Sequence, residues 1–267
     1  MKRVGFAQFE PVFGRPGENL RRVTRLAREA GKADLLVFPE LAVSGYDFTG
    51  RDELMDLAEP FGEGPTSLAL LELAGELNAA LVIGYPERAG DTAYNSALLA
   101  VPGGALHNYR KIHLFSREKE LFAPGDAPPP VADTPAGRVG MMICFDWIFP
   151  ETARLLALAG AQIIAHPSNL VLSFCQRAMF ARSVENRVFT ITANRTGSED
   201  RAGRTLAFTG GSVIYDPEGN LLAQAPGEGE QVSLVEVDPA VADDKQVNGE
   251  NHLFGDRRTE LYGGLVV

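Results

Sequence analysis

Short apolar runs alternate with longer segments of helical periodicity through most of this chain, and this alternation limits the fold more than any other feature. The runs "LLVFP", "LVIGYP", "VGMMIC" and "AQIIAHP" have the length and composition of buried strands. Between them, "SLALLELAGELNAA" and the residues after Pro150 carry apolar side chains at helical spacing. Because interleaved strands and helices form layers, the sequence predicts an α/β protein with mixed sheets whose inner faces are buried.

The remaining segments extend this pattern toward both ends of the chain. Leu20, Val23 and Leu26 predict an early helix that Gly31 ends, and a further helix is expected over residues 176–185. "NSALLAV" and "GALHNYRKIHL" predict two antiparallel strands joined by a turn at residues 102–104. Strands are also predicted at "RVGFAQFE", "VFTITANR" and "QVSLVEVD", and "GGSVIYDPEGNLL" predicts two strands joined by a Pro-Glu-Gly-Asn turn. Several strands are apolar throughout, which is compatible with two sheets packed on each other and helices outside.

The size and charge of the chain exclude several classes of partner. Its 267 residues are 45% hydrophobic, enough for one large core, and we expect a single domain over residues 1–267. The formal net charge of -10 disfavours nucleic acid and anionic membranes, which reward a basic face. No apolar stretch approaches the length of about 20 residues that a membrane helix needs. The start "MKRVGFAQFEP" is too polar for a signal peptide, so the expected location is the cytoplasm.

The two cysteines, Cys144 and Cys175, are too few for a disulfide framework and suit a reducing compartment. A zinc site built from both of them and His166 would need a ligand spacing that matches no familiar pattern. No metal site is therefore expected. Cys175, at a predicted helix start, is most simply a small side chain of the core.

Three chemically active residue types stand at the ends of predicted strands. Glu40 follows "LLVFP", Lys111 lies in "NYRKIHLF" and Cys144 follows "VGMMI". Taken singly, they are explained as a solvated glutamate, an edge-strand charge and a small buried hydrophobe. Strand ends converge into clefts in α/β proteins, however, and a cysteine nucleophile needs both a base and a donor for the oxyanion. If the three converge, Glu40 can accept the thiol proton and Lys111 can stabilise the negative charge.

A histidine base is the alternative mechanism. His113 lies two residues beyond Lys111 on the same predicted strand, so both side chains would share a face. Spacing alone leaves a papain-like pair of Cys144 and His113 open, although this pair assigns no role to Glu40 or Lys111. His166 is more simply a pocket or packing residue. The other histidines are His107 and His252.

Three blocks in the order Glu, Lys, Cys resemble the nitrilase superfamily of carbon-nitrogen hydrolases. The blocks are "LLVFPELAVSGY", "NYRKIHLFSREKELFAPGD" and "GMMICFDWIFPETARLLALAGAQIIAHPSN", and weaker matches continue to "RRTELY". The resemblance covers nearly the whole chain. It implies a four-layer α-β-β-α sandwich with two mixed β-sheets, assembled as a homodimer or a higher homo-oligomer. A C-terminal segment at about residues 240–267 is expected to contribute to the dimer interface.

The same resemblance implies a role for each residue of the site. Glu40 would be the general base, Lys111 the stabiliser of the oxyanion, and Cys144 the nucleophile. Glu118, favoured over Glu120 by its spacing from the lysine, would orient Lys111 and the substrate. No metal or organic cofactor is implied. The implied substrate-binding positions are Tyr46, Phe145, Asp146, Trp147, His166 and Asn169, although Asp146 and Trp147 can equally be capping or packing residues before Pro150.

The reaction implied is hydrolysis of a small aliphatic amide through a cysteine thioester, with release of ammonia and a carboxylic acid. "CFDW" departs from the Cys-Trp-Glu sequence that nitrilases commonly show, and most branches of the family cleave amides. The alternatives are a nitrilase that acts on small aliphatic nitriles or dinitriles, an N-carbamoyl amide hydrolase, and a non-catalytic scaffold with the same fold. Arg177 or Arg182 can bind a substrate carboxylate, but salt bridging or solvation on a helix is the simpler explanation.

Overall fold

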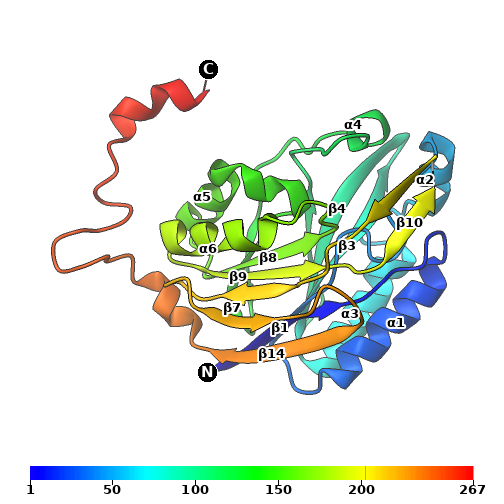
Figure 1. Ribbon diagram of the computed structural model, residues 1–267. Coiled ribbons are helices and arrows are strands. Elements are labelled where there is room, and N and C mark those ends of the chain that lie inside the picture. Colours follow the sequence, from blue (N-terminus) through cyan, green and yellow to red (C-terminus); the bar gives the residue numbers. More distant parts are fainter. Residues whose placement is uncertain (202, 267) are drawn as a thin grey trace.

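Two six-stranded mixed sheets pack face to face in the computed structural model, which describes residues 1–201 and 203–266, and helices cover both outer faces (Figure 1). The predicted four-layer α-β-β-α sandwich is therefore confirmed. The first sheet has the order β14 (Gln231–Val237), β1 (Lys2–Gln8), β2 (Leu35–Val37), β3 (Ala80–Ala89), β4 (Thr92–Val101), β5 (Ala105–Arg110). The second has the order β13 (Leu221–Gln224), β12 (Val213–Tyr215), β9 (Phe189–Asn194), β8 (Ile163–Ser168), β7 (Gly137–Met141), β6 (Val131–Thr134).

The two sheets share one plan, with three central parallel strands and antiparallel strands at the edges. Strands β1, β2 and β3 are parallel to one another, as are β7, β8 and β9. The hairpin predicted at residues 102–104 joins β4 to β5, with Val101 opposite Ala105. Each parallel connection carries a helix, because parallel neighbours need a long crossover.

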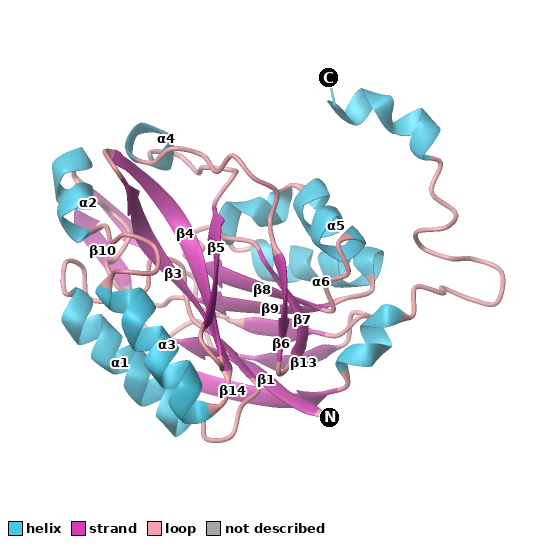
Figure 2. Cartoon of the chain, turned by 180° about the vertical axis from the view of Figure 1, so that it is seen from behind, coloured by secondary structure: helices cyan, strands magenta, loops and turns pink. Residues whose placement is uncertain are grey.

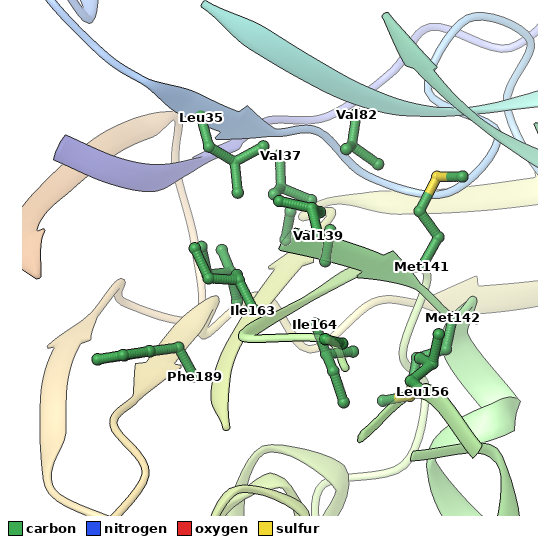
Figure 3. Packing of buried hydrophobic residues seen from close by; sticks show 14 of the residues in the cluster. Leu35, Val37, Val82, Val139, Met141, Met142, Leu156, Ile163, Ile164 and Phe189 are labelled. Atoms are coloured by element: carbon green, nitrogen blue, oxygen red, sulfur yellow. The ribbon is translucent and has the colours of Figure 1, made fainter. Parts of the chain in front are cut away.

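Alternation along single strands produces the layers. Leu35 and Val37 of β2 point into the core between the sheets, whereas Leu36 between them packs against the outer helices. Figure 3 shows Leu35, Val37 and Val82 of the first sheet above Val139 and Met141 of the second. Strands buried on both faces must be apolar at every position, which explains the continuous runs in the sequence.

Helices α1 (Pro16–Glu29) and α3 (Pro65–Leu77) cover the first sheet, and α5 (Pro150–Leu158) and α6 (Cys175–Asn186) cover the second (Figures 1 and 2). Each of α1, α3 and α5 has a proline in its first turn, where the missing N–H is not needed. Cys175 begins α6 and is fully buried. Shorter elements are α2 (Arg51–Leu57), α4 (Glu118–Leu121) and the 3₁₀ helices η1 (Cys144–Ile148), η2 (Pro239–Asp243) and η3 (Thr259–Val266).

A small hairpin and a C-terminal arm complete the chain. Strands β10 (Ser198–Arg201) and β11 (Arg204–Ala207) form a separate two-stranded sheet beside α2. After η2 the chain runs away from the sandwich and ends in η3 (Figure 1). Among the described residues, no helix combines the length and the apolar character that crossing a bilayer requires.

The strand expected to run through His113 ends earlier, at Arg110, so that expectation was wrong. The backbone N–H of Lys111 still donates to Asn95 on the neighbouring strand (2.8 Å), but its carbonyl accepts from Gly125 (2.9 Å). The chain therefore leaves the sheet at this point. Lys111 and His113 then contact different carboxylates instead of sharing one strand face.

Candidate active site

Glu40 lies in a tight turn at the carboxyl end of β2. The next residue, Leu41, has a φ of 46°, which is rare for a residue with a side chain and typical of strained functional turns. Gly84 of β3 holds this turn, because its N–H donates to Pro39 (3.0 Å) and its carbonyl accepts from Ala42 (2.9 Å). A Cβ at Gly84 would lie 2.4 Å from the Cα of Glu40, so only glycine allows this approach.

Lys111 lies between two carboxylates at the carboxyl end of β5. Its Nζ donates to Oε1 of Glu40 at 2.7 Å and lies 2.8 Å from Oε2 of Glu118. Lys111 and Glu40 are fully buried, and Glu118 nearly so. Glu120, the other candidate, is exposed and lies 3.6 Å from the Arg117 guanidinium. The structure thus brings Glu118, and not Glu120, to the lysine.

Cys144 begins the 3₁₀ helix η1, three residues beyond Met141 at the end of β7, and so lies between a strand and a helix as the sequence predicted. Its φ is 40°, a left-handed backbone that glycine adopts far more easily. Asp146 caps this turn, since one carboxylate oxygen accepts from the N–H of Ile143 (2.9 Å) and from the Tyr109 hydroxyl (2.8 Å). The other oxygen of Asp146 contacts Nδ1 of His113 at 2.8 Å. The contacts of Asp146 are therefore those of a capping residue, which was one of the two roles that the sequence left open for it.

Burial and the two carboxylates set the protonation of this cluster. Burial raises the pKa of Cys144 well above the usual range, the Glu40 carboxylate raises it further, and the Lys111 ammonium opposes both. Burial also raises the pKa of Glu40. Burial alone would lower the pKa of Lys111, but Glu118 and Glu40 raise it well above its usual value. The lysine thus stays charged, the thiol starts protonated, and a base must remove its proton.

Three buried side chains in this region, those of Glu40, Asn95 and Asn169, have hydrogen-bonding atoms without a partner among the described residues. Oε1 of Glu40 accepts from Lys111 and from Asn95 (2.7 Å), but Oε2 has no hydrogen-bond partner among the described residues. The side-chain amide of Asn169, which is nearly buried, is equally unpartnered within residues 1–201 and 203–266. The backbone N–H of Asn169 interacts with the Cys144 sulfur and lowers its pKa. Buried polar atoms without partners are costly, so these atoms are the ones a bound ligand would satisfy.

His166 holds the backbone of Cys144. Its Nε2 lies 2.9 Å from the carbonyl oxygen of Cys144, and its Nδ1 lies 3.0 Å from Oγ1 of Thr192. A carbonyl can only accept, so Nε2 carries the proton and the threonine hydroxyl donates to Nδ1. Burial lowers the pKa of His166 to about 4, which keeps this neutral tautomer in place.

This buried neutral histidine should make stability depend on pH. In the unfolded chain His166 binds a proton near pH 6.5, whereas in the folded protein it does so only near pH 4. Its stabilising contribution is therefore complete above about pH 6.5 and is lost as the pH falls toward 4. We expect the free energy of unfolding to decrease by about 3 kcal/mol from this group between pH 7 and pH 4.

Urea denaturation of the protein and of His166→Gln at several pH values measures this contribution. In His166→Gln the free energy of unfolding should change less with pH, because the contribution of His166 is absent. His107→Gln is the matched control, because His107 is half-buried on β5 opposite Leu99, outside the site, and this variant should keep the slope of the unsubstituted protein. Equal slopes for the protein and His166→Gln would contradict the expectation.

The other expected positions have more varied surroundings. The Phe145 ring packs on Phe149 (5.5 Å between centroids), and the nearly buried Trp147 meets Phe174 edge to face (5.6 Å). Arg182 donates through Nε to the Trp147 carbonyl (2.9 Å), whereas Arg177 is exposed on α6. These substrate-binding assignments stay predictions.

Two contacts of the site were not anticipated from the sequence. Asn95 of β4 donates to Glu40, and the Tyr46 hydroxyl donates to Oε1 of Glu118 at 2.6 Å. A polar Asn at the start of the predicted buried strand "NSALLAV" was a signal for the first contact. Among the described residues, no group of three or more His, Cys, Asp or Glu side chains has the arrangement of a metal site.

The sequence of this chain is similar to those of known hydrolases over most of its length. Residues 3–246 match the model of a family described as carbon-nitrogen hydrolase. A nitrilase of Pyrococcus abyssi is 43% identical over 98% of this chain and 99% of its own. An (R)-stereoselective amidase of a Pseudomonas species is 37% identical over 84% of this chain and 82% of its own.

Solved structures of an amidase from Nesterenkonia sp. AN1 have the same fold at 28% identity, covering 98% of this chain and 95% of theirs. In one variant structure the acetamide moiety of fluoroacetamide is attached to the active-site cysteine, and the TM-score is 0.80. Another variant is in complex with butyramide, with a TM-score of 0.78.

Proposed function

Because this chain belongs to the carbon-nitrogen hydrolase family of the nitrilase superfamily, we propose that it hydrolyses a small aliphatic amide through a thioester on Cys144. The products are ammonia and a carboxylic acid. One observation carries this proposal: the buried Lys111 ammonium bridges Glu40 and Glu118, and its charge and that of Glu40 act on the Cys144 thiol. A buried cation between two carboxylates beside a thiol is an arrangement that supports nucleophilic catalysis.

Acylation begins with attack of the Cys144 sulfur on the amide carbonyl carbon. The unpartnered Oε2 of Glu40 accepts the thiol proton. Negative charge develops on the carbonyl oxygen, where Lys111 Nζ and the N–H of Asn169 are the available donors. The C–N bond then breaks, and the proton held by Glu40 leaves with the amine as ammonia. The acyl group remains on sulfur as a thioester.

Deacylation repeats these steps with water. Glu40 removes a proton from a water molecule, which attacks the thioester carbonyl. The C–S bond breaks, the acid is released, and the sulfur recovers the proton from Glu40. The raised pKa of Glu40 suits this exchange, because a base works best when its pKa lies near the operating pH.

Structures of a similar amidase with amide compounds in its active site favour an amide over a nitrile as the substrate. The similar Nesterenkonia amidase binds butyramide and carries an acetamide moiety on its active-site cysteine. The identity of 43% with a nitrilase is the observation that favours a nitrile as the second candidate substrate. Both reactions need the same three groups, and they differ in whether the first attack is on a carbonyl or a cyano carbon.

A substrate panel scored by ammonia release tests the proposal. The panel contains acetamide, butyramide, an ω-amide, an N-carbamoyl compound and a small dinitrile. We expect the highest kcat/KM with a small aliphatic amide, and Cys144→Ala measured beside it sets the background. A dinitrile preferred over all amides would favour the second candidate. Release equal to the Cys144→Ala background with every compound would contradict both.

Gly84 provides a test of how closely Glu40 must be placed. In Gly84→Ala the new methyl carbon would approach the Glu40 backbone to 2.4 Å, so the turn must shift. We expect kcat to fall about 100-fold, the scale of loss expected when a reacting group is misplaced by about 1 Å. Gly75→Ala is the matched control, because Gly75 is exposed inside α3 with open space around it. It should keep full activity and gain about 1 kcal/mol of stability. Full activity of Gly84→Ala would contradict the expectation.

We also propose that the chain acts as a single domain that forms a homodimer, with the C-terminal segment at about residues 240–267 in the interface. Helices α5 and α6 expose the large apolar side chains Leu155, Leu158, Phe180 and Val184, and Ile148 of η1 and Phe174 just before α6 are exposed as well. The C-terminal arm, which leaves the sandwich in Figure 1, exposes Val247, Leu261, Tyr262 and Leu265. Exposed apolar patches of this kind support association, and a second copy brings the same faces.

Sedimentation velocity tests this assembly. Leu155→Asp should shift the protein from dimer to monomer, because it introduces a charge into the apolar patch of α5. Leu68→Asp is the matched control, since Leu68 is also exposed but lies on α3, in the opposite helical layer. A monomer before any substitution would contradict the proposal.

A further inference from the structure

The Tyr46 hydroxyl links a loop after β2 to the lysine cluster. Its O–H donates to Oε1 of Glu118 at 2.6 Å, and the same oxygen accepts from Lys111 Nζ at 2.9 Å. Burial raises the pKa of Tyr46 well above the usual value and the nearby Glu118 carboxylate adds to this, so the hydroxyl keeps its proton and donates. The other oxygen of Glu118 accepts from the N–H of Phe115 (3.1 Å). Tyr46 therefore supplies one of the few bonds that orient Glu118.

The backbone that carries Tyr46 is held from the far part of the chain. Glu199 of β10 accepts from the N–H of Tyr46 at 3.1 and 3.2 Å, and from the N–H of Asp47 at 2.6 Å. Glu199 is only 5% exposed, so its carboxylate has exchanged water for these donors. Hydrogen bonds to a charged acceptor are the stronger class in proteins. The loop is therefore held directly at the residue whose hydroxyl contacts Glu118.

Arg195 compensates the charge of Glu199 inside the protein. The Arg195 side chain is fully buried, and its Nη1 donates to Oε1 of Glu199. The guanidinium also lies over the Phe208 ring, 4.0 Å from its centroid, and the same ring meets Tyr46 edge to face at 5.9 Å. A buried ion pair is costly to desolvate, and buried pairs contribute in some proteins by selecting one geometry. Glu199 therefore holds the backbone of Tyr46, and Arg195 packs on Phe208, whose ring contacts the ring of Tyr46.

We propose that Arg195 and Glu199 are positioning residues for hydrolysis, acting through Tyr46 on the Glu118 carboxylate and hence on Lys111. This inference rests on the proposed function, since it assigns these residues to the same site. The order of contacts is Arg195, Glu199, the backbone of Tyr46, the Tyr46 hydroxyl, Glu118 and Lys111. Without the bond from the Tyr46 hydroxyl, Glu118 keeps only its bonds to the Phe115 N–H and to Lys111. The carboxylate is then less firmly oriented, and Lys111 is held less firmly where negative charge develops on the substrate oxygen.

A double-mutant cycle with Tyr46→Phe and Glu199→Gln tests this order of action. Tyr46→Phe keeps the ring and removes only the hydroxyl, and we expect kcat to fall about 30-fold with KM nearly unchanged, the scale of one bond to a charged group. Glu199→Gln keeps the shape of the side chain and should lower kcat about 10-fold. Because both act through one contact, the double variant should lose little more than Tyr46→Phe alone.

The controls separate positioning from general stability. Tyr85→Phe is the matched tyrosine variant, because Tyr85 is also buried and its hydroxyl bonds to Asn108, outside the site. It should keep kcat even if its melting temperature falls. Each kcat is divided by the folded fraction of the same preparation, which circular dichroism measures. A loss in the double variant close to the product of the single losses, about 300-fold, would show independent effects and overturn the inference.

A second measurement covers the cases in which a variant fails to fold or no substrate is turned over. If Glu199→Gln does not fold, Arg195→Lys replaces it in the cycle, because it keeps the charge and changes the geometry of the pair. The rate of Cys144 alkylation by iodoacetamide needs no substrate, and a displaced Lys111 should slow it in the same non-additive way. If no substrate is cleaved while the alkylation cycle is non-additive, the proposed function fails, and the inference is reduced to the positioning of Lys111 beside Cys144. Additive alkylation rates would overturn the inference.

Discussion

Replacing Cys144 with alanine is expected to lower kcat for a small amide by about 10⁴-fold or more, the loss typical of removing a nucleophile that acts with a base. The buried Lys111 and Glu40 would remain, but no atom could form the thioester. The melting temperature should change little, because a small side chain replaces a small side chain. Ammonia release and circular dichroism of the same preparation measure both quantities.

Cys175→Ala is the matched control for this substitution. Cys175 is also buried, but it begins α6 and packs in the core. We expect this variant to keep its activity, and its melting temperature should change about as little as that of Cys144→Ala, because both substitutions remove only one buried sulfur atom. In the unsubstituted protein, mass spectrometry should find an acyl group on Cys144 when the reaction with a slowly hydrolysed substrate is quenched. Turnover that survives in Cys144→Ala would exclude the thioester route.

The second large effect is expected for Glu40→Gln, with a loss in kcat of about 10³-fold, within the range for a missing general base. The amide keeps the shape of the side chain and can still accept from Lys111 and Asn95. It cannot take the proton of a thiol whose pKa burial has raised. Both acylation and deacylation should therefore slow.

Two controls make this result specific. Glu59→Gln changes another nearly buried glutamate whose pKa burial also raises, but Glu59 bonds to Thr66 outside the site, so activity should persist. His113→Ala tests the histidine base. The His113 ring bonds to Asp146 and stacks on Phe149 at 3.7 Å, so we expect this variant to keep most of its activity when folded. Near-normal rates for Glu40→Gln together with loss for His113→Ala would transfer the base role to histidine.

Local pattern predicted the α/β class and most of the strands and helices, whereas the four-layer order was implied by the family resemblance. The strand "LLVFP" and the helix after Pro150 were found because burial on both faces requires continuous apolar residues, and burial on one helix face requires a period of 3.6. The strand through His113 was misplaced for a physical reason. Apolar and polar residues alternate in "GALHNYRKIHL" as they do in a strand. The Lys111 ammonium, however, binds the carboxylates of Glu40 and Glu118, which lie outside the sheet, so the chain leaves the sheet before His113.

The site was predictable only in part. Glu40 and Cys144 follow apolar runs that the sequence shows as strands, whereas Lys111 lies inside a predicted strand that in the structure ends one residue before it. The contact from Tyr46 to Glu118 joins residues 72 positions apart, and that from Glu199 to Tyr46 joins residues 153 apart. Such contacts leave no periodic trace, because neither partner needs a particular neighbour in the chain.

The amino-acid sequence by itself determined most of the strands and helices of the two sheets, which faces are buried, and which residues can act as nucleophile, base and cation. These properties depend on neighbours within a few positions. Only the tertiary structure decided that Lys111 lies between Glu40 and Glu118, that His166 holds the Cys144 carbonyl, and that Glu199 holds the Tyr46 loop. Hydrogen bonds and ion pairs act over about 3 Å, so they exist only after the two sheets have packed and brought distant strand ends together.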